Sequence, residues 1–181
     1  MKKYSLLLVI VSIFTLFFFS GCANSKIKKY TKYINSSMET VRNISITVDV
    51  TDNDVLVYKY VRNINIDGVN AKIETIESTL SSSFVLEDKV SSDSITDIDK
   101  KSLNSINLTK KLLDSFEVKS GVLKATINKD NISSVLGSNS LLILDNAELT
   151  ITFNKKELSK LECVFKTESG KDVVINIEYN Y

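Results

Sequence analysis

Hydrophobic and polar residues alternate along most of the chain after residue 43, which is the pattern of half-buried β-strands. The clearest stretch covers residues 147–179, where three alternating segments are separated by turns at Asn154-Lys155 and Ser169-Gly170. A second alternating stretch begins at Ile44 and passes through turns at residues 52–54 and at Asp67-Gly68. These patterns predict an antiparallel sheet with one apolar face.

A helical spacing precedes the first predicted strand. Apolar residues recur there every three or four positions, at Ile27, Tyr30, Ile34, Met38 and Val41. Four lysines fill the other faces of the first turns: Lys26, Lys28, Lys29 and Lys32. One interpretation is an amphipathic helix packed on the sheet with its lysines in water. A compatible one is a basic collar that meets anionic lipid headgroups, at about 1 kcal/mol per lysine.

The middle of the chain is expected to supply the remaining elements. A fourth strand is expected around residues 83–87, and the polar segment 88–105 is expected to be a solvated loop. The aspartates of that segment lack the glycine and the terminal glutamate of an EF-hand calcium loop. A second helix is predicted over residues 106–116, then a strand around the Ser120-Gly121 turn, and a short helix from Asp130 to Leu136 capped by Asn128 or Asp130.

Taken together, these elements predict an α+β fold. We expect one curved, half-barrel-like antiparallel sheet of about six to eight strands, covered by two or three helices. No stretch recurs in the sequence at a fixed period, so a repeat architecture is not indicated.

The first 22 residues have the three-part layout of a secretory signal peptide. Lys2 and Lys3 are followed by an almost unbroken apolar run from Ser5 to Phe19, and then by small residues. The run is short for a membrane-spanning helix, which needs about 20 apolar residues.

The segment Phe19-Ser20-Gly21-Cys22 resembles the lipobox of bacterial lipoproteins. The resemblance implies that a peptidase cleaves between Gly21 and Cys22 and that the Cys22 thiol carries a diacylglyceryl group. Two or more acyl chains hold a protein stably on a membrane. We therefore expect residues 1–21 to be a lipoprotein signal peptide, residues 22–40 an anchor with a short tether and the amphipathic helix, and residues 41–181 a single domain.

Composition excludes several classes of function. The chain of 181 residues has 23 basic and 22 acidic residues and no histidine. It therefore lacks the basic footprint of a nucleic-acid-binding protein, and no mechanism can use an imidazole. Its five glycines form no phosphate-binding cluster, and with Cys22 acylated Cys163 has no partner and is expected to be buried. We expect no enzymatic activity, no cofactor and no metal site.

The order of elements resembles that of the LolA/LolB/LppX-like lipoproteins, in which a half-barrel closes over helices. The resemblance rests on the meander Ala147–Tyr179 and the segment Leu108–Gly137, and it implies an apolar cavity. The first functional hypothesis is an extracytoplasmic, membrane-anchored lipoprotein that binds a lipid or another hydrophobic ligand. Its candidate lining residues are Tyr60, Ile151, Phe153, Phe165, Ile175 and Ile177, which could equally form a dry core.

The alternative hypothesis is an extracytoplasmic protein–protein interaction or adaptor module with a filled core. A cystatin-like or nuclear-transport-factor-like fold would suit that role equally well. An enclosed apolar space of about 300 Å³ or more would favour the ligand-binding hypothesis.

Overall fold

A single antiparallel sheet of nine strands dominates the structure. The computed structural model describes residues 25–103, 106–136 and 144–181. A helix over residues 25–40 is followed by β1 (Asn43–Asp52), β2 (Val55–Asp67), β3 (Asn70–Leu80), β4 (Leu86–Ile95), β5 (Leu113–Lys119), β6 (Val122–Ile127), the short helix α2 (Ile132–Leu136), β7 (Ala147–Asn154), β8 (Glu157–Lys166) and β9 (Asp172–Asn180). Single 3₁₀ turns cover Lys100–Leu103, Lys110–Leu112 and Lys129–Asn131.

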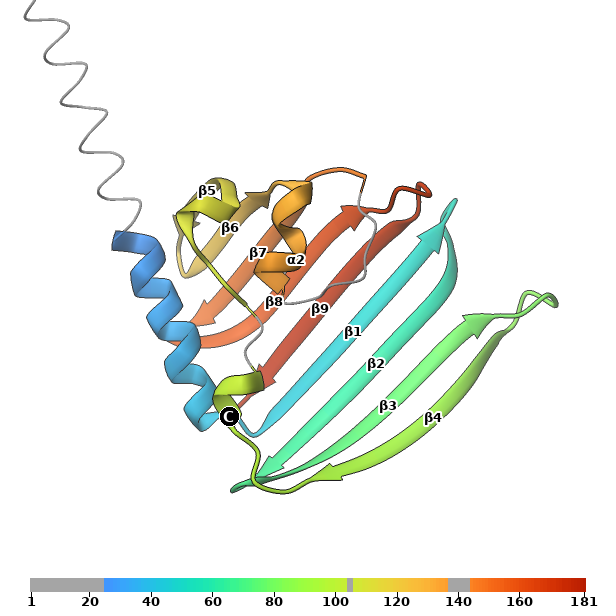
Figure 1. Cartoon of the computed structure of the whole chain (residues 1–181), viewed down its shortest axis with the longest axis horizontal. Coiled ribbons are helices and arrows are strands. Elements are labelled where there is room, and N and C mark those ends of the chain that lie inside the picture. The colour runs from blue at the N-terminus through green and yellow to red at the C-terminus, as the bar shows by residue number, and fades with distance from the viewer. Residues whose placement is uncertain (1–24, 104–105, 137–143) are drawn as a thin grey trace, which may run out of the picture.

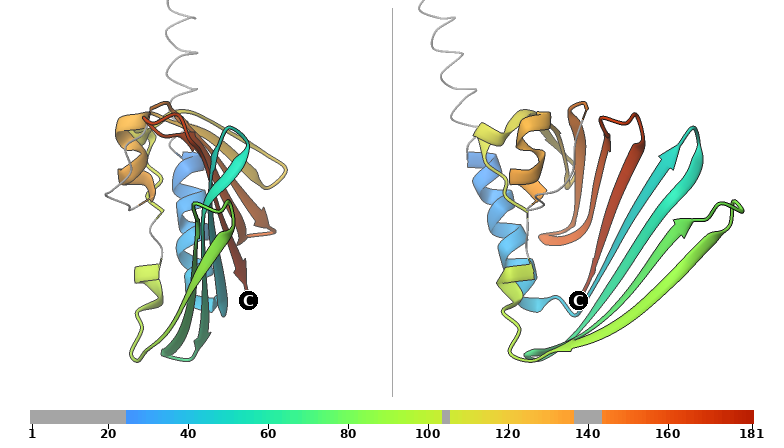
Figure 2. Two further views of the ribbon diagram at one scale, coloured as in Figure 1. Left: turned by 90° about the vertical axis from the view of Figure 1, so that its right-hand side faces the viewer. Right: turned by 45° about the vertical axis from the view of Figure 1, so that its right-hand side comes forward.

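Two meanders make up the sheet. The strand order is β4-β3-β2-β1-β9-β8-β7-β6-β5, and every neighbouring pair is antiparallel. β1 and β9 join the meanders along nine residue pairs, from Asn43 opposite Asn180 to Thr51 opposite Asp172. The strands fan out and curve, and β4 and β5 form the two edges (Figures 1 and 2).

The core lies between one face of this sheet and the segments that cover it. The helix over residues 25–40 and α2 lie on the same side of the sheet (Figure 2). Ile34 and Met38 of the helix are almost completely buried, as are Leu149, Ile151 and Leu161 of β7 and β8. The alternation of the sequence therefore decides which side chains enter the core, as expected for a sheet covered on one face.

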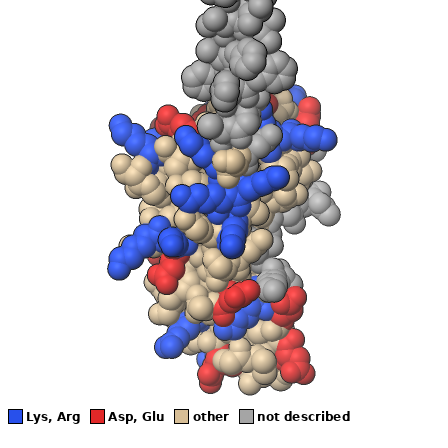
Figure 3. Space-filling model, turned by 90° about the vertical axis from the view of Figure 1, so that its left-hand side faces the viewer, with Lys and Arg blue, Asp and Glu red and all other residues tan. Residues whose placement is uncertain are grey.

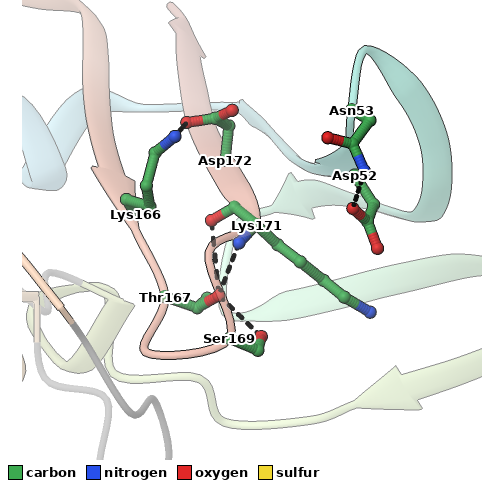
Figure 4. Close-up of polar contacts among 7 residues, drawn as sticks. All are labelled: Asp52, Asn53, Lys166, Thr167, Ser169, Lys171 and Asp172. Carbon is green, nitrogen blue, oxygen red and sulfur yellow. Dashed lines mark hydrogen bonds and ion pairs between the residues drawn. The ribbon is translucent and has the colours of Figure 1, made fainter.

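Polar contacts stabilise the turn that follows β1 and the turn that connects β8 to β9 (Figure 4). Lys166 and Asp172, which face each other on β8 and β9, form an ion pair of 3.1 Å. Between them, the Thr167 hydroxyl accepts a hydrogen bond of 3.1 Å from the Lys171 amide and lies 3.0 Å from the Ser169 hydroxyl. In the β1–β2 turn, Asn53 donates to Asp52 at 3.0 Å. These groups are engaged within their own turns.

The fold is more nearly all-β than the predicted α+β class, which is a correction. The expected helix over residues 106–116 is absent: residues 106–109 are irregular, and β5 begins at Leu113. A register shift between Leu113 and Ser115 explains the error. Because of this shift, the inward-facing residues Leu113 and Phe116 are three positions apart in the sequence. A spacing of three is also that of apolar residues on one face of a helix.

The expected loop over residues 88–105 is a second correction. Its first part belongs to β4, which pairs with β3 from Ala71 opposite Ile95 to Leu80 opposite Leu86. All residues of β4 after Leu86 are exposed, so neither face of the strand selects apolar side chains. An edge strand of this kind has no alternation for sequence analysis to detect. The strand expected around residues 83–87 therefore lies later in the chain, with residues 81–85 outside it. The sheet has nine strands instead of six to eight.

Other predicted elements are confirmed. The helix occupies residues 25–40, and the closing meander forms β7, β8 and β9. The predicted short helix corresponds to the 3₁₀ turn Lys129–Asn131 followed by α2, and the Asn128 side chain caps its start by accepting a hydrogen bond of 3.0 Å from the Asp130 amide.

Candidate functional site

The lysines of the first helix form a basic surface, called here the lysine face (Lys26, Lys28, Lys29 and Lys32). All four side chains are exposed, whereas Ile27 and Ile34 turn into the core. The Lys29 ammonium lies 5.7 Å from the centre of the Tyr33 ring, within range of a cation–π contact. Basic side chains gather on this side of the molecule (Figure 3). The helix N-terminus therefore carries concentrated positive charge.

The predicted lipidation site, Cys22, and the predicted cleavage position after Gly21 lie outside the described residues. The described chain starts with the helix at residue 25, three positions after Cys22. Among the described residues, no helix has the length and apolar character needed to cross a membrane.

Three of the six candidate ligand-lining residues are fully buried. Ile151, Phe153 and Phe165 are exposed by 6 % or less. The Phe153 ring lies 4.9 Å from the Tyr30 ring and 6.2 Å from the Tyr33 ring, so the helix fills the space in front of it. These contacts are those of a packed core.

The other three candidates are half-buried and face the same way. Tyr60, Ile175 and Ile177 lie on β2 and β9, where the cover of the sheet is less complete. Tyr60 faces Val48, and Val48 faces Ile175, so a row of side chains crosses three strands. The structure thus places all six residues on one face of the sheet. Three hollows on the described surface are lined by other residues.

One of these hollows lies on the opposite face of the sheet. It has a volume of about 320 Å³ and is open to solvent. Amide side chains dominate its lining, which comprises Asn43, Ile44, Ser45, Asn63, Ile64, Asn65, Lys72, Glu74 and Asn180. Lys72 and Glu74 form an ion pair of 3.3 Å across its rim, and Ser45 donates to Asn63 at 2.8 Å. The hollow is polar, so it is not the apolar cavity that the ligand-binding hypothesis requires.

Cys163 is buried on β8 and faces Ile175 and Leu149. Burial, with a smaller contribution from the charge of Glu148, raises the pKa of its thiol to about 12. Because the thiolate is the reactive form, this cysteine is inert at neutral pH. Its position matches the predicted role as a small buried side chain.

The described residues include no group of three or more Cys, Asp or Glu side chains close enough together to bind a metal ion. Asp93 lies on β4, where its carboxylate accepts a hydrogen bond of 2.8 Å from the Ser94 amide. Asp97 follows the strand in a left-handed conformation with φ of 57°. These aspartates therefore belong to an edge strand and its turn.

Sequence analysis missed one buried polar group that ties the helix to the sheet. Ser37 is 2 % exposed. Its hydroxyl donates a hydrogen bond of 2.8 Å to the Tyr33 carbonyl and accepts one of 2.8 Å from the Leu158 amide. The hydroxyl of Tyr181, just after β9, donates to the Leu158 carbonyl at 2.5 Å. The signal for this site was a serine next to Met38 on the apolar face of the helix.

Comparisons with known proteins add little to this description. No family model matches the chain, and no curated protein matches it. A de novo designed fluorescence-activating β-barrel is among the solved structures that resemble it, with 11% identity over 81% of this chain and 99% of the designed chain. The TM-score of that match is 0.23, which is too low to support any argument about fold or function.

Proposed function

We propose that this chain is a non-enzymatic bacterial lipoprotein, held outside the cytoplasm by lipid on Cys22, whose sheet serves as an interaction module. The observation that carries the proposal is the sequence Phe19-Ser20-Gly21-Cys22 at the end of an apolar run, three positions before a folded helix. Diacylglyceryl at Cys22 supplies two acyl chains, which is enough for stable anchoring.

The short tether sets where the lysine face lies relative to the bilayer. Lys26 is four residues after Cys22, so even a fully extended chain places it within roughly 14 Å of the lipid attachment point. This upper limit is less than twice the distance over which charges act at physiological salt, about 8 Å, and a less extended tether brings Lys26 closer. The lysine face can therefore bind anionic headgroups and orient the sheet on the membrane.

The exposed part of the sheet supports an interaction role. β3 and β4 extend beyond the helical cover, and β4 has no neighbour on its outer side among the described residues (Figure 1). At the tip of their hairpin, Phe84 is 83% exposed and Val85 is 59% exposed. Phe84 also adopts a left-handed conformation with φ of 59°, which is costly for a bulky residue. Exposed, strained apolar residues at a protruding tip are typical of a contact surface.

Hydrophobic-ligand binding is a second candidate, favoured by the partly open apolar strip on β1 and β9. Val48, Val50 and Ile175 of this strip are half-buried, although they pack against the core. A ligand would have to lie along this open strip, because the buried candidates Ile151 and Phe153 already contact other side chains. Native mass spectrometry of protein purified from cells separates the candidates: a co-purifying lipid supports ligand binding, and a mass without ligand supports the interaction module.

Metabolic labelling with a fatty acid tests the anchor. The wild-type chain should incorporate label and sediment with membranes, whereas Cys22→Ala should lose both properties. Cys163→Ala is the matched control, because the only other cysteine is buried and should leave labelling unchanged. Equal labelling of the wild type and Cys22→Ala would refute the proposal.

A further inference from the structure

The edge strand β4 is the longest unpaired backbone surface among the described residues. It has ten residues, whereas the opposite edge, β5, has seven and is interrupted by a register shift. Every second residue of an edge strand directs its amide and carbonyl groups outward, where they can pair with another strand. Proteins commonly cover or block such an edge, and here no described segment covers it.

We propose that β4 pairs antiparallel with β4 of a second copy of this chain, so that two nine-stranded sheets join into one. This assignment rests on the proposed interaction role of the sheet but is independent of the lipid anchor. Charged and apolar side chains along the strand support this pairing.

Symmetry allows few registers. In an antiparallel pair, opposed residues have their side chains on the same face of the sheet. A twofold axis between two β4 strands must therefore pass between two copies of the same residue, which face each other. With Ser91 on the axis, Lys89 faces Asp93 of the second copy, and the pair occurs twice. Both side chains are exposed on the same face of β4. This register overlaps residues 87–95, which is nearly the whole strand.

The other registers close to this one are less favourable. With Ser92 on the axis, Lys89 faces Ile95 and Asp93 faces Ser91, so no opposite charges pair. With Val90 on the axis, Glu87 faces Asp93 of the second copy twice. With Lys89 on the axis, two lysines face each other. Opposite charges directly across a strand pair are stabilising, and like charges are destabilising. A lysine in the middle of an edge strand ordinarily discourages pairing. Here it disfavours the register in which two lysines face each other, and it gains an opposite charge only where an acidic residue faces it.

Lys89 is available for this contact. No described carboxylate forms an ion pair with its ammonium group, although the side chain of Glu77 lies across from it on β3. The Asp93 carboxylate interacts with its neighbouring amide and leaves further lone pairs free. The proposed contact therefore breaks no described ion pair.

An apolar row on the other face supports the same pairing. Val61 faces Ile76, and Ile76 faces Val90, so the row crosses β2, β3 and β4 and ends at the edge. Val90 is 69% exposed. With Ser91 on the axis, Val90 lies diagonally across from Val90 of the second copy, within reach of an apolar contact. The row then continues across both sheets.

The pairing also agrees with attachment of both copies to one membrane. A twofold axis normal to the sheet leaves the two first helices on the same face of the joined sheet. Both lysine faces would then lie on that side of the joined sheet. A heterologous contact, such as β4 with β5 of another copy, would instead generate open polymers.

Cysteine cross-linking of the full-length chain in its host membranes tests this proposal. Ser91→Cys places two thiols on the axis, where opposed Cα atoms are about 4.5–5.5 Å apart and a disulfide can form. Ser94→Cys is the matched control, because it is an exposed serine on the same strand whose two copies would be roughly 20 Å apart. Mild oxidation should give a disulfide-linked dimer of Ser91→Cys and none of Ser94→Cys.

Charge reversal provides the second arm. In the Ser91→Cys background, Lys89→Asp places an aspartate of each copy opposite Asp93 of the other and should reduce cross-linking roughly tenfold. Adding Asp93→Lys restores opposite charges and should restore cross-linking. Equal cross-linking of Ser91→Cys and Ser94→Cys, no cross-linking of either, or no recovery in the charge swap would each overturn the pairing. Fatty-acid labelling of the same cells reports separately on the anchor, so failure of one proposal is distinguishable from failure of the other.

Discussion

The hydroxyl of Ser37 offers a sharp test of how the first helix is held on the sheet. It accepts a hydrogen bond from the amide of Leu158, a residue with no exposed surface, at the start of β8. The adjacent Ser36 is exposed and donates only to the Tyr33 carbonyl, at 3.1 Å. Two neighbouring serines of one helix therefore differ in whether they bind the sheet.

Replacing Ser37 with alanine leaves the Leu158 amide buried without a partner. An unsatisfied buried donor costs about 1–3 kcal/mol, and the better helix propensity of alanine returns about 0.5 kcal/mol. We therefore expect Ser37→Ala to lower the free energy of unfolding by about 0.5–2.5 kcal/mol. Ser36→Ala loses no buried contact and should leave stability unchanged or raise it by about 0.5 kcal/mol.

Urea denaturation of the chain from residue 23 onward, followed by circular dichroism, measures both variants. A gap of about 2 kcal/mol between them corresponds to roughly 4–8 °C in the midpoint of thermal unfolding for a chain of this size. Equal stabilities of Ser36→Ala and Ser37→Ala would refute the reasoning, because they would mean that the Ser37–Leu158 hydrogen bond contributes nothing.

Three further predictions follow from single features. Phe84→Asn should raise the free energy of unfolding by about 1 kcal/mol, because asparagine tolerates the left-handed conformation better than phenylalanine. Urea unfolding measures this change, and a loss of stability would show that the exposed Phe84 ring makes stabilising contacts. Cys163 should resist a thiol reagent at pH 8, where a pKa of about 12 leaves about one thiolate in ten thousand, and rapid labelling in the folded state would contradict its burial. Replacing the lysine face with glutamines should weaken co-sedimentation with anionic vesicles but not with neutral ones, by about 1 kcal/mol per lysine at low salt.

The parts of the fold that sequence analysis predicted are those with one buried face. Along β7, Ala147, Leu149, Ile151 and Phe153 enter the core and alternate with more exposed residues. The first helix was recognisable for the same reason, since Ile27, Ile34 and Met38 share its buried side. In each case burial imposes a period on the sequence, and the period reveals the element.

Elements without that constraint were missed or misassigned. β4 is held by its backbone pairing with β3, and its side chains meet water on both faces, so its sequence of serines and charged residues resembles a loop. In β5, the shift between Leu113 and Ser115 replaced alternation with a helical spacing. The first error displaced the fourth strand, and the second replaced β5 with a helix, which led to the wrong fold class.

The candidate site was predictable only in part. Sequence periodicity placed the six ligand-lining residues on one face of the sheet, because that property depends on local alternation. Whether Phe153 lines a cavity depends on Tyr30, which precedes it by more than a hundred residues and packs against its ring. The Ser37–Leu158 contact joins positions 121 residues apart, and alternation carries no information about such pairs.

The proposed anchor of this β-sheet protein on a membrane is lipid on Cys22. Mass spectrometry of the N-terminal peptide from membrane-extracted protein tests it most directly. We expect a peptide that begins at Cys22 and carries the added mass of at least a diacylglyceryl group. A membrane-bound chain that retains Met1, or a peptide in which Cys22 is unmodified, would contradict it.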